Sequence, residues 1–200
     1  MLALAGACSY TTADLDVADP VLVQSTQIFA SDGTLVTTLQ ASENREIVRL
    51  DQLPAHVPDA VVAIEDARFW SHRGVDVKAI LRAAVANTTE GEIVEGGSTI
   101  TQQYVKNTLL DSTQTLHRKA HEAVLALRLE QHYTKARILE LYLNTIFFGN
   151  GAYGIQAAAE EYFGVRADAL TLAQAATLAG MIRAPSAFDP TDAPAAAWMP

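Results

Sequence analysis

The chain has 200 residues, of which half are hydrophobic and 18% are charged, against an average charged fraction of about 25%. This composition excludes a disordered or fibrous chain and predicts one mainly helical domain with a sizeable core. The net charge of −9 excludes general binding to nucleic acid, and the single cysteine, Cys8, excludes an internal disulfide framework.

The two ends of the chain differ in composition from the middle. Residues 1–8 form an apolar stub that is shorter than the roughly 20 residues needed to cross a bilayer. We interpret residues 1–20 as the last piece of a truncated membrane anchor and an acidic linker. A lipoprotein box ending at Cys8 is the alternative. Residues 191–200 are rich in alanine and proline and are expected to begin a C-terminal linker.

Residues 21–50 are predicted to form a small β segment. Short β-branched runs occur at 21–23, 27–29, 35–36 and 47–48. The sequence Ser31-Asp32-Gly33 separates two of these runs and is a turn signal, so it predicts a hairpin.

Residues 51–190 carry apolar side chains at helical spacing and are predicted to form the main, helical domain. Predicted helix starts and stops are the caps Asp59, Asp76, Ser98 or Thr99, Thr115, Thr134 and Thr171 and the breakers Gly149, Gly164 and Pro185. The first of these helices is expected over 60–68, and a loop over 88–97. The apolar stripes expected on the second and fourth helices are Ile80, Leu81, Ala84 and Val85, and Leu116, Ala120, Ala123, Val124 and Leu127.

An acidic pair, Glu65 and Asp66, directly follows the apolar run 60–64. Burial raises the pKa of a carboxyl group and suits it to act as a general acid or base near neutral pH. The competing interpretation is a pair at a helix end that faces water.

A glycine-hinged loop, Gly96-Gly-Ser-Thr-Ile-Thr-Gln-Gln103, leads into a capped helix start. The free N–H groups and the helix dipole make such a start suitable for an anion, and Lys106 lies one to two turns further on. The loop lacks the Gly-Lys-Ser/Thr ending of a P-loop, and taken alone it is more often just a helix cap.

Glu122 lies one helical turn from Arg118 and Lys119. Relative to the predicted apolar stripe of this helix, Glu122 is expected to project sideways. A surface ion-pair trio is one interpretation, and a carboxylate held among cations that face a phosphate group is the other. The window 102–140 holds six basic and four acidic residues in an otherwise acidic chain, which favours a bound anion. His117 and His121 have the spacing of a two-histidine metal site, but no glutamate follows His117 as a metalloprotease requires.

Five segments in order resemble the motifs of glycosyltransferase family 51, the peptidoglycan transglycosylase domain of class A penicillin-binding proteins and monofunctional transglycosylases. They are Glu65-Asp-Ala-Arg-Phe-Trp-Ser-His-Arg-Gly74, Gly96-Gly-Ser-Thr-Ile-Thr-Gln-Gln103 with Lys106-Asn107, Arg118-Lys-Ala-His-Glu122, Lys135-Ala-Arg-Ile-Leu-Glu-Leu-Tyr-Leu-Asn144, and Gly151-Ala-Tyr-Gly-Ile155 with Tyr162-Phe-Gly164. The resemblance covers about residues 25–190.

The resemblance implies a mainly α, lysozyme-like fold with two lobes and a short N-terminal β hairpin. It implies polymerisation of lipid II onto a growing glycan strand, with inversion and release of undecaprenyl pyrophosphate. The implied place is the outer face of the cytoplasmic membrane, with a single N-terminal anchor. It assigns Glu65 as the general base and Glu122 to the leaving pyrophosphate, directly or through a divalent cation such as Mg or Mn. Implied substrate contacts are Asp66, Phe69, His72, Ser98, Thr99, Gln102, Gln103, Lys106, Gln114, Arg118 and Lys119.

Two features of the chain depart from that family. Relatives often carry arginine where this chain has Gln114, which weakens the expected affinity for the donor phosphate. The C-terminal transpeptidase domain of the bifunctional members is expected to be missing, so the chain is either a monofunctional enzyme or a fragment. A lysozyme-like glycoside hydrolase and an inactive glycan-binding fragment remain as alternatives. Lys106, Arg118 and Lys119 favour the transferase, because a hydrolase has no pyrophosphate to neutralise.

Overall fold

The computed structural model describes residues 26–39, 45–90, 96–110 and 116–190. In these ranges a β hairpin is followed by α-helices and by three short 3-10 turns. The strands are β1 (Thr26–Phe29) and β2 (Leu35–Leu39). The α-helices are α1 (His56–Glu65), α2 (Val77–Glu90), α3 (Ile100–Leu109), α4 (Leu116–His132), α5 (Lys135–Thr145), α6 (Ile155–Phe163) and α7 (Leu172–Met181). The turns are η1 (Leu50–Gln52), η2 (Phe69–Ser71) and η3 (Ala167–Ala169). The predicted mainly α class is confirmed.

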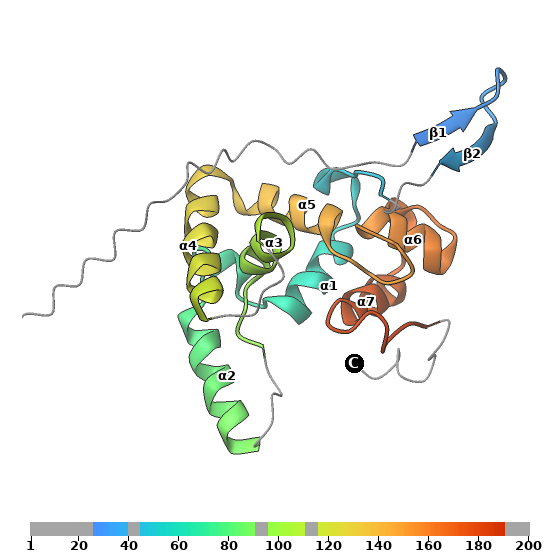
Figure 1. Cartoon of the computed structure of the whole chain (residues 1–200). Helices are drawn as coiled ribbons and strands as arrows, with labels where there is room; N and C mark the ends of the chain where they lie inside the picture. Colours follow the sequence, from blue (N-terminus) through green and yellow to red (C-terminus); the bar gives the residue numbers. More distant parts are fainter. Residues whose placement is uncertain (1–25, 40–44, 91–95, 111–115, 191–200) are drawn as a thin grey trace, which may run out of the picture.

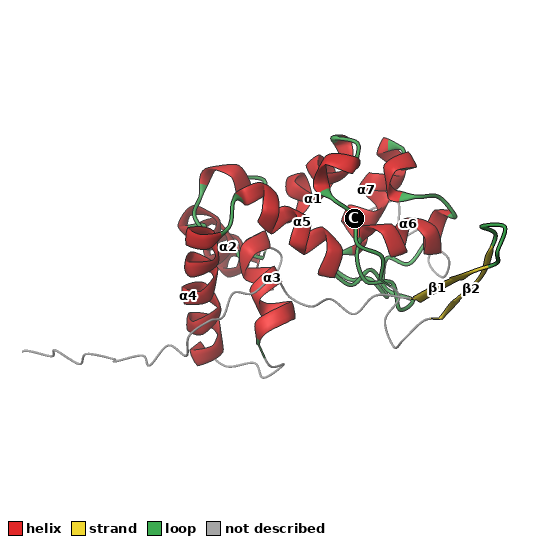
Figure 2. Cartoon of the chain, turned by 90° about the horizontal axis from the view of Figure 1, so that it is seen from above, coloured by secondary structure: helices red, strands yellow, loops and turns green. Residues whose placement is uncertain are grey.

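The helices form two groups (Figure 1). Helices α2, α3 and α4 lie on one side, α6 and α7 lie on the other, and α1 and α5 lie between them, as the view from above also shows (Figure 2). Helix α1 packs against α7, and α3 packs against both α4 and α5. The core therefore runs through α1, α3 and α5, with the largest fully buried side chains including Tyr142, Phe69, Phe148, Ile100 and Ile138.

The predicted hairpin is confirmed, and it projects away from the helices in both views. The Asp32 carboxylate accepts a hydrogen bond from the Thr34 backbone N–H at 2.9 Å, and Gly33 has a φ of +85°, which favours glycine. Residues 47–48, assigned to the same β segment by their β-branched pattern, form no strand. Instead the Val48 N–H and C=O both bond to the Asn144 side chain, at 2.9 and 2.8 Å.

Most helix ends lie where their caps predict them. Asp76 accepts from the backbone N–H groups of Lys78 and Ala79, and Thr99, Thr134 and Thr171 each accept from the N–H three residues on. Gly164 ends α6 in the left-handed conformation, with φ +63°. These ends are set by contacts within one turn, which is why the sequence predicts them.

Three helices have boundaries that differ from the prediction. Helix α1 begins at His56 and ends at Glu65, so Asp59 lies in its first turn rather than capping it. Pro58 is tolerated there because the first N–H groups of a helix have no intrahelical acceptor. Helix α2 continues to Glu90, through the predicted loop start at Thr88. Helix α5 ends at Thr145, before the glycine turn at Gly149.

The predicted inward faces of α2 and α4 are wrong. In α4 the buried residues are Glu122, Leu125, Ala126 and Leu129, which share one face at spacings of three, four and seven. The residues predicted inward, Val124 and Leu127 among them, are 38% and 44% exposed. In α2, Leu81 and Val85 are more than 60% exposed. The helical period identifies residues that share a face, but the packing partners decide which face is buried.

Several predictions concern residues outside the described ranges. These are the stub and linker at 1–20, the cap Thr115, Gln114, and the C-terminal segment 191–200. In the described part of the chain, no helix combines the length and the apolar character needed to cross a bilayer.

Candidate active site

A cleft of about 850 Å³ lies between the two groups of helices and brings both predicted carboxylates together. Glu65 enters it from the end of α1, and Glu122 enters it from α4. Helix α3 contributes Gln103, Lys106 and Asn107, which share one face at spacings of three and four. The remaining lining comes from the ends of α1, α3 and α5, the loop before α3, the segments after α5 and α7, and Arg45: Ile64, Gly96, Ser98, Thr108, Thr145, Ile146, Phe147, Tyr153, Ile182, Arg183 and Pro185.

Glu65 is partly buried at the C-terminal end of α1 and is held by one hydrogen bond, which the Gln103 Nε2 donates to its Oε2 at 2.6 Å. Burial raises the pKa of Glu65 above the ordinary value of 4.5. The Gln103 bond and the charge of Arg183 oppose this shift, and Asp66 adds to it. Glu65 is therefore a carboxylate with raised proton affinity that faces an open cleft, which suits a general base.

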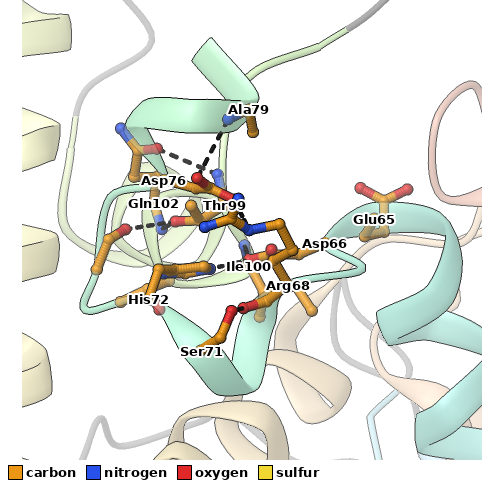
Figure 3. A network of polar contacts seen from close by, with 12 residues as sticks. Glu65, Asp66, Arg68, Ser71, His72, Asp76, Ala79, Thr99, Ile100 and Gln102 are labelled. Atoms are coloured by element: carbon orange, nitrogen blue, oxygen red, sulfur yellow. Dashed lines mark hydrogen bonds and ion pairs between the residues drawn. The ribbon is translucent and has the colours of Figure 1, made fainter. Parts of the chain in front are cut away.

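Asp66, the next residue, points the other way (Figure 3). Its backbone, with φ −158° and ψ 73°, leaves the helical conformation and ends α1, and the two neighbouring side chains point in different directions. The Asp66 carboxylate is buried, accepts from the Ile100 backbone N–H at 3.1 Å and lies 2.8 Å from the His72 Nε2. Asp66 thus joins the end of α1 to the start of α3, and the neighbouring acids have different environments.

The start of α3 is fixed by a second set of buried contacts. Thr99 and Gln102 form a capping box, and the Thr99 hydroxyl donates to the Gly74 carbonyl at 2.5 Å. Gly74 has a φ of +75°, and a Cβ on it would lie 2.7 Å from the Ala126 carbonyl oxygen. Only glycine allows this loop to lie directly against α4, so the loop holds α3 and α4 in register on one side of the cleft.

Glu122 is 1% exposed and lies between two cations. Lys119, one turn earlier, forms an ion pair with its Oε1, and the Arg118 guanidinium lies 3.5 Å from its Oε2. The Lys119 Nζ also donates to the Ser98 hydroxyl at 2.8 Å, and Ser98 lines the cleft. The prediction that Glu122 projects sideways from α4 is wrong, because Glu122 lies on the buried face.

Cations also face the cleft directly. Lys106 lines it from α3, as the sequence predicts, and the structure adds Arg45 and Arg183. The Arg45 guanidinium lies 5.4 Å from the centre of the Tyr153 ring, which also lines the cleft. Arg45 and Arg183 were not among the predicted site residues, because they lie in segments far from the motifs. The signal available for Arg183 was a lone cation just after a predicted helix end.

Other predicted contact residues lie outside the main cleft. Phe69 is fully buried in the core, and His72, Thr99 and Gln102 are buried in the contacts around Asp66 and α3. Asp66 and Thr99 line a separate hollow of about 260 Å³ that shares Glu65 and Arg183 with the cleft. The structure does not bring these side chains into the main cleft, and their contacts with substrate stay predictions. Gln114 lies outside the described residues.

The described residues offer no fitting set of ligands for the expected divalent cation. They contain no group of three or more histidine, cysteine, aspartate or glutamate side chains that could hold a metal, and His117 and His121 belong to no such group. The carboxylate assigned to the cation, Glu122, is paired with Arg118 and Lys119.

In this cleft one carboxyl group has a raised pKa and another carboxylate is paired with cations. Such a site suits acid–base chemistry on an anionic substrate. The sequence model of the family described as "Transglycosylase" matches residues 32–198. The chain therefore belongs to the transglycosylase family, which confirms the resemblance seen in its motifs and the expected class of enzyme.

The similar proteins are penicillin-binding proteins. Penicillin-binding protein 1A of Aquifex aeolicus is 46% identical over 167 residues, which are 84% of this chain and 23% of that protein. Penicillin-binding protein 1A of Escherichia coli is 48% identical over 165 residues, 82% of this chain and 19% of that protein. A crystal structure of penicillin-binding protein 1A from Haemophilus influenzae matches with a TM-score of 0.44 and 25% identity, over 87% of this chain and 16% of that chain. The chain spans about a fifth of the length of these relatives.

Proposed function

We propose that this chain is a peptidoglycan glycosyltransferase domain that polymerises lipid II into glycan strands and releases undecaprenyl pyrophosphate. The observation that carries the proposal is the unequal environment of two carboxylates in one cleft. Burial raises the proton affinity of Glu65, whereas two cations hold Glu122. This division matches a reaction that needs a base at one point and positive charge at another.

The proposed reaction is a single displacement at the anomeric carbon of the donor. The acceptor sugar's 4-hydroxyl oxygen attacks that carbon as Glu65 takes the hydroxyl proton, and a new glycosidic C–O bond forms with inversion. The bond between the anomeric carbon and the phosphate oxygen breaks, and its electron pair leaves with the pyrophosphate. Lys106 lines the cleft, and Lys119 contacts Ser98, which also lines it. In the proposed reaction these two lysines offset the charge that develops on the leaving group, and the ion pair with Glu122 holds Lys119.

The cations separate this proposal from the lysozyme-like alternative. A hydrolase needs a protonated acid for an uncharged sugar leaving group, and it has no phosphate charge to offset. In this cleft the second carboxylate is paired with Arg118 and Lys119, and Lys106 faces the same space. That arrangement suits an anionic leaving group better than a neutral one.

We propose further that the chain works at the outer face of the cytoplasmic membrane, where a lipid-linked substrate is met, and that an N-terminal anchor and a transpeptidase domain belong to the full protein. The helical unit over 51–190 is the proposed catalytic domain. Support for the membrane comes from the exposed apolar side chains of α2 and α4, which include Val77, Leu81 and Val85 at more than 60% exposed. The aromatic side chains of Phe69 and Phe148 do not contribute to such a surface, because they are fully buried.

The test is to incubate the purified chain with fluorescent lipid II in detergent and to separate the products by size. The proposal predicts long glycan and free undecaprenyl pyrophosphate. Glu65→Gln should lower the rate at least ~100-fold, because it keeps the shape and removes the base. Glu161→Gln, an exposed position on α6, is the matched control and should keep the wild-type rate. Cleavage of preformed glycan would favour the hydrolase, and no reaction would favour the inactive fragment.

A further inference from the structure

A chain of two hydrogen bonds connects Glu65 to the core of the protein. The Gln103 amide lies between Glu65 and Tyr142, which come from α1 and α5, while Gln103 itself comes from α3. The Gln103 Nε2 donates to the Glu65 Oε2 at 2.6 Å, and the Tyr142 hydroxyl donates to the Gln103 Oε1 at 2.9 Å. One amide therefore contacts the candidate base with one end and a tyrosine with the other.

The two ends of an amide differ, so its orientation has a chemical consequence. With Nε2 toward Glu65, Gln103 donates to the carboxylate and favours its charged form. With the amide reversed, its oxygen would face the carboxylate and favour the protonated form. The shape of the side chain is the same in both orientations, so its hydrogen-bond partners select one of them: a charged Glu65 favours Nε2, and the group at the other end of the amide adds a selection of its own.

Tyr142 supplies that selection. Its side chain is fully buried, and burial together with the charges of Glu65 and Asp66 raises the pKa of its hydroxyl well above the ordinary value of 10.0. The hydroxyl therefore keeps its proton at any working pH. Among the described residues, Gln103 is the acceptor that the hydroxyl contacts. A reversed amide would point an N–H at this O–H and leave a buried donor without an acceptor, which is costly.

We propose that Tyr142 is a positioning residue that fixes the orientation of the Gln103 amide and so makes Gln103 a donor to Glu65. This inference rests on the proposed role of Glu65 as the base. Tyr142 acts through Gln103 and does not touch the substrate.

Other charges act on Glu65 and must be held constant in a test. Arg183 after α7 lowers the pKa of Glu65, and Asp66 raises it. Lys106 of α3, Glu122 of α4 and Arg45 line the same cleft. In the described part of the chain no hydrogen bond or ion pair joins these charged groups to the Tyr142 hydroxyl. Tyr142→Phe removes one hydroxyl group and leaves each of these charges in place.

The first measurement uses the unmodified protein. In NMR spectra, the side-chain amide protons of Gln103 should show nuclear Overhauser contacts to the Glu65 side chain. Contacts of these protons to the Tyr142 ring alone would mean that the amide is reversed, and this would overturn the proposal. Because no variant is needed, the result does not depend on how well Tyr142→Phe folds.

The second measurement follows the Glu65 carboxyl directly by carbon-13 NMR during a pH titration, with Glu65→Gln used to assign its signal. Tyr142→Phe should move the Glu65 titration to higher pH, and in the Gln103→Leu background the same change should have no further effect. Tyr162→Phe is the matched control, since the Tyr162 hydroxyl also donates one hydrogen bond, to the Phe148 carbonyl at 2.9 Å. It should leave the titration unchanged.

The catalytic readout is the pair kcat and KM with lipid II. Tyr142→Phe should lower kcat about fivefold, the effect expected for one lost neutral hydrogen bond, with KM little changed. An unchanged Glu65 titration, or a shift that persists without Gln103, overturns the positioning role. The titration is independent of the reaction, so it distinguishes this outcome from a failure of Glu65 as the base, which Glu65→Gln reports by itself.

Discussion

The helices on the two sides of the cleft bury their apolar residues to different extents. Helices α1 and α7 pack against each other, and α6 packs on α7, so most of their large apolar side chains are closed off. Helices α2 and α4 leave Val77, Leu81, Val85 and Leu127 between 44% and 63% exposed. Helices α1 and α7 also expose Ile64 and Leu172, but the larger number of exposed apolar side chains lies on α2 and α4, and we propose that this surface meets another apolar phase.

The two carboxylates follow the same division. Glu65 lies at the end of α1 and faces the cleft, where burial disfavours its charged form. Glu122 lies on α4 and is stabilised by Arg118 and Lys119. The comparison shows how one cleft places a proton acceptor beside a cluster of held cations: Glu65 is desolvated and accepts from Gln103 of α3, whereas Glu122 is paired with two cations of its own helix.

Removing the charge of Glu122 should disrupt the cluster of cations on the α4 side of the cleft. Glu122→Gln leaves Arg118 and Lys119 without their shared anion, so Lys119 loses its fixed position near Ser98. We expect polymerisation to fall on the order of tenfold or more. We also expect a loss of about 2 kcal/mol of stability, less than the ~3–5 for a fully buried pair because the Lys119 side chain is 48% exposed.

The check is a thermal melt together with the lipid II assay. A loss of this size corresponds to a fall in Tm of about 4–8 °C. Glu161→Gln, which is exposed on α6, should change stability by less than about 0.5 kcal/mol. A Glu122→Gln protein that melts and polymerises like the wild type would show that the ion pairs are incidental.

A charged residue introduced on the exposed apolar face of α2 should test whether this face contacts a membrane. Leu81→Glu should reduce binding of the chain to lipid vesicles measured by flotation, because a charge on that face opposes contact with an apolar phase. Leu172→Glu is the matched control, since Leu172 is exposed to a similar extent, 65% against 62%, but lies on α7. Equal flotation of the two variants would count against a membrane role for α2.

Glu65→Gln should stabilise the protein at neutral pH, whereas Glu122→Gln should destabilise it. The pKa of Glu65 is raised in the folded state, so the wild type loses stability as the pH rises from below 4.5 through that folded pKa. Glutamine carries no charge to desolvate. The difference in Tm between Glu65→Gln and the wild type should therefore be positive at pH 7 and close to zero at pH 4. A variant that is less stable than the wild type at pH 7 would mean that burial does not oppose the Glu65 charge.

The sequence predicts those features that depend on neighbouring residues. Thr99, Thr134 and Thr171 cap the beginnings of their helices and Gly164 caps the end of α6, as expected, since caps act within one turn. The candidate carboxylates are also identified from local context: Glu65 follows an apolar run, and Glu122 follows two cations at a spacing of one helical turn.

The sequence does not predict features that depend on how helices meet. The buried face of α4 was assigned wrongly, because the helical period cannot say which face has a partner. The contact between Gln103 and Tyr142 joins residues 39 positions apart on different helices. Arg183 reaches the cleft from the segment after α7, and only the packing of α7 on α1 brings it near Glu65.

The most direct test of the account is the pH dependence of kcat/KM for lipid II polymerisation by the wild type and by Glu65→Gln. If Glu65 is the base, the wild-type activity rises with pH along a limb that lies above the ordinary glutamate pKa of 4.5. Glu65→Gln should lose that limb and retain a rate at least ~100-fold lower, while Glu122→Gln keeps the limb at a reduced rate. A Glu65→Gln protein with the same limb, or with the wild-type rate, would contradict the assignment of Glu65 as the proton acceptor.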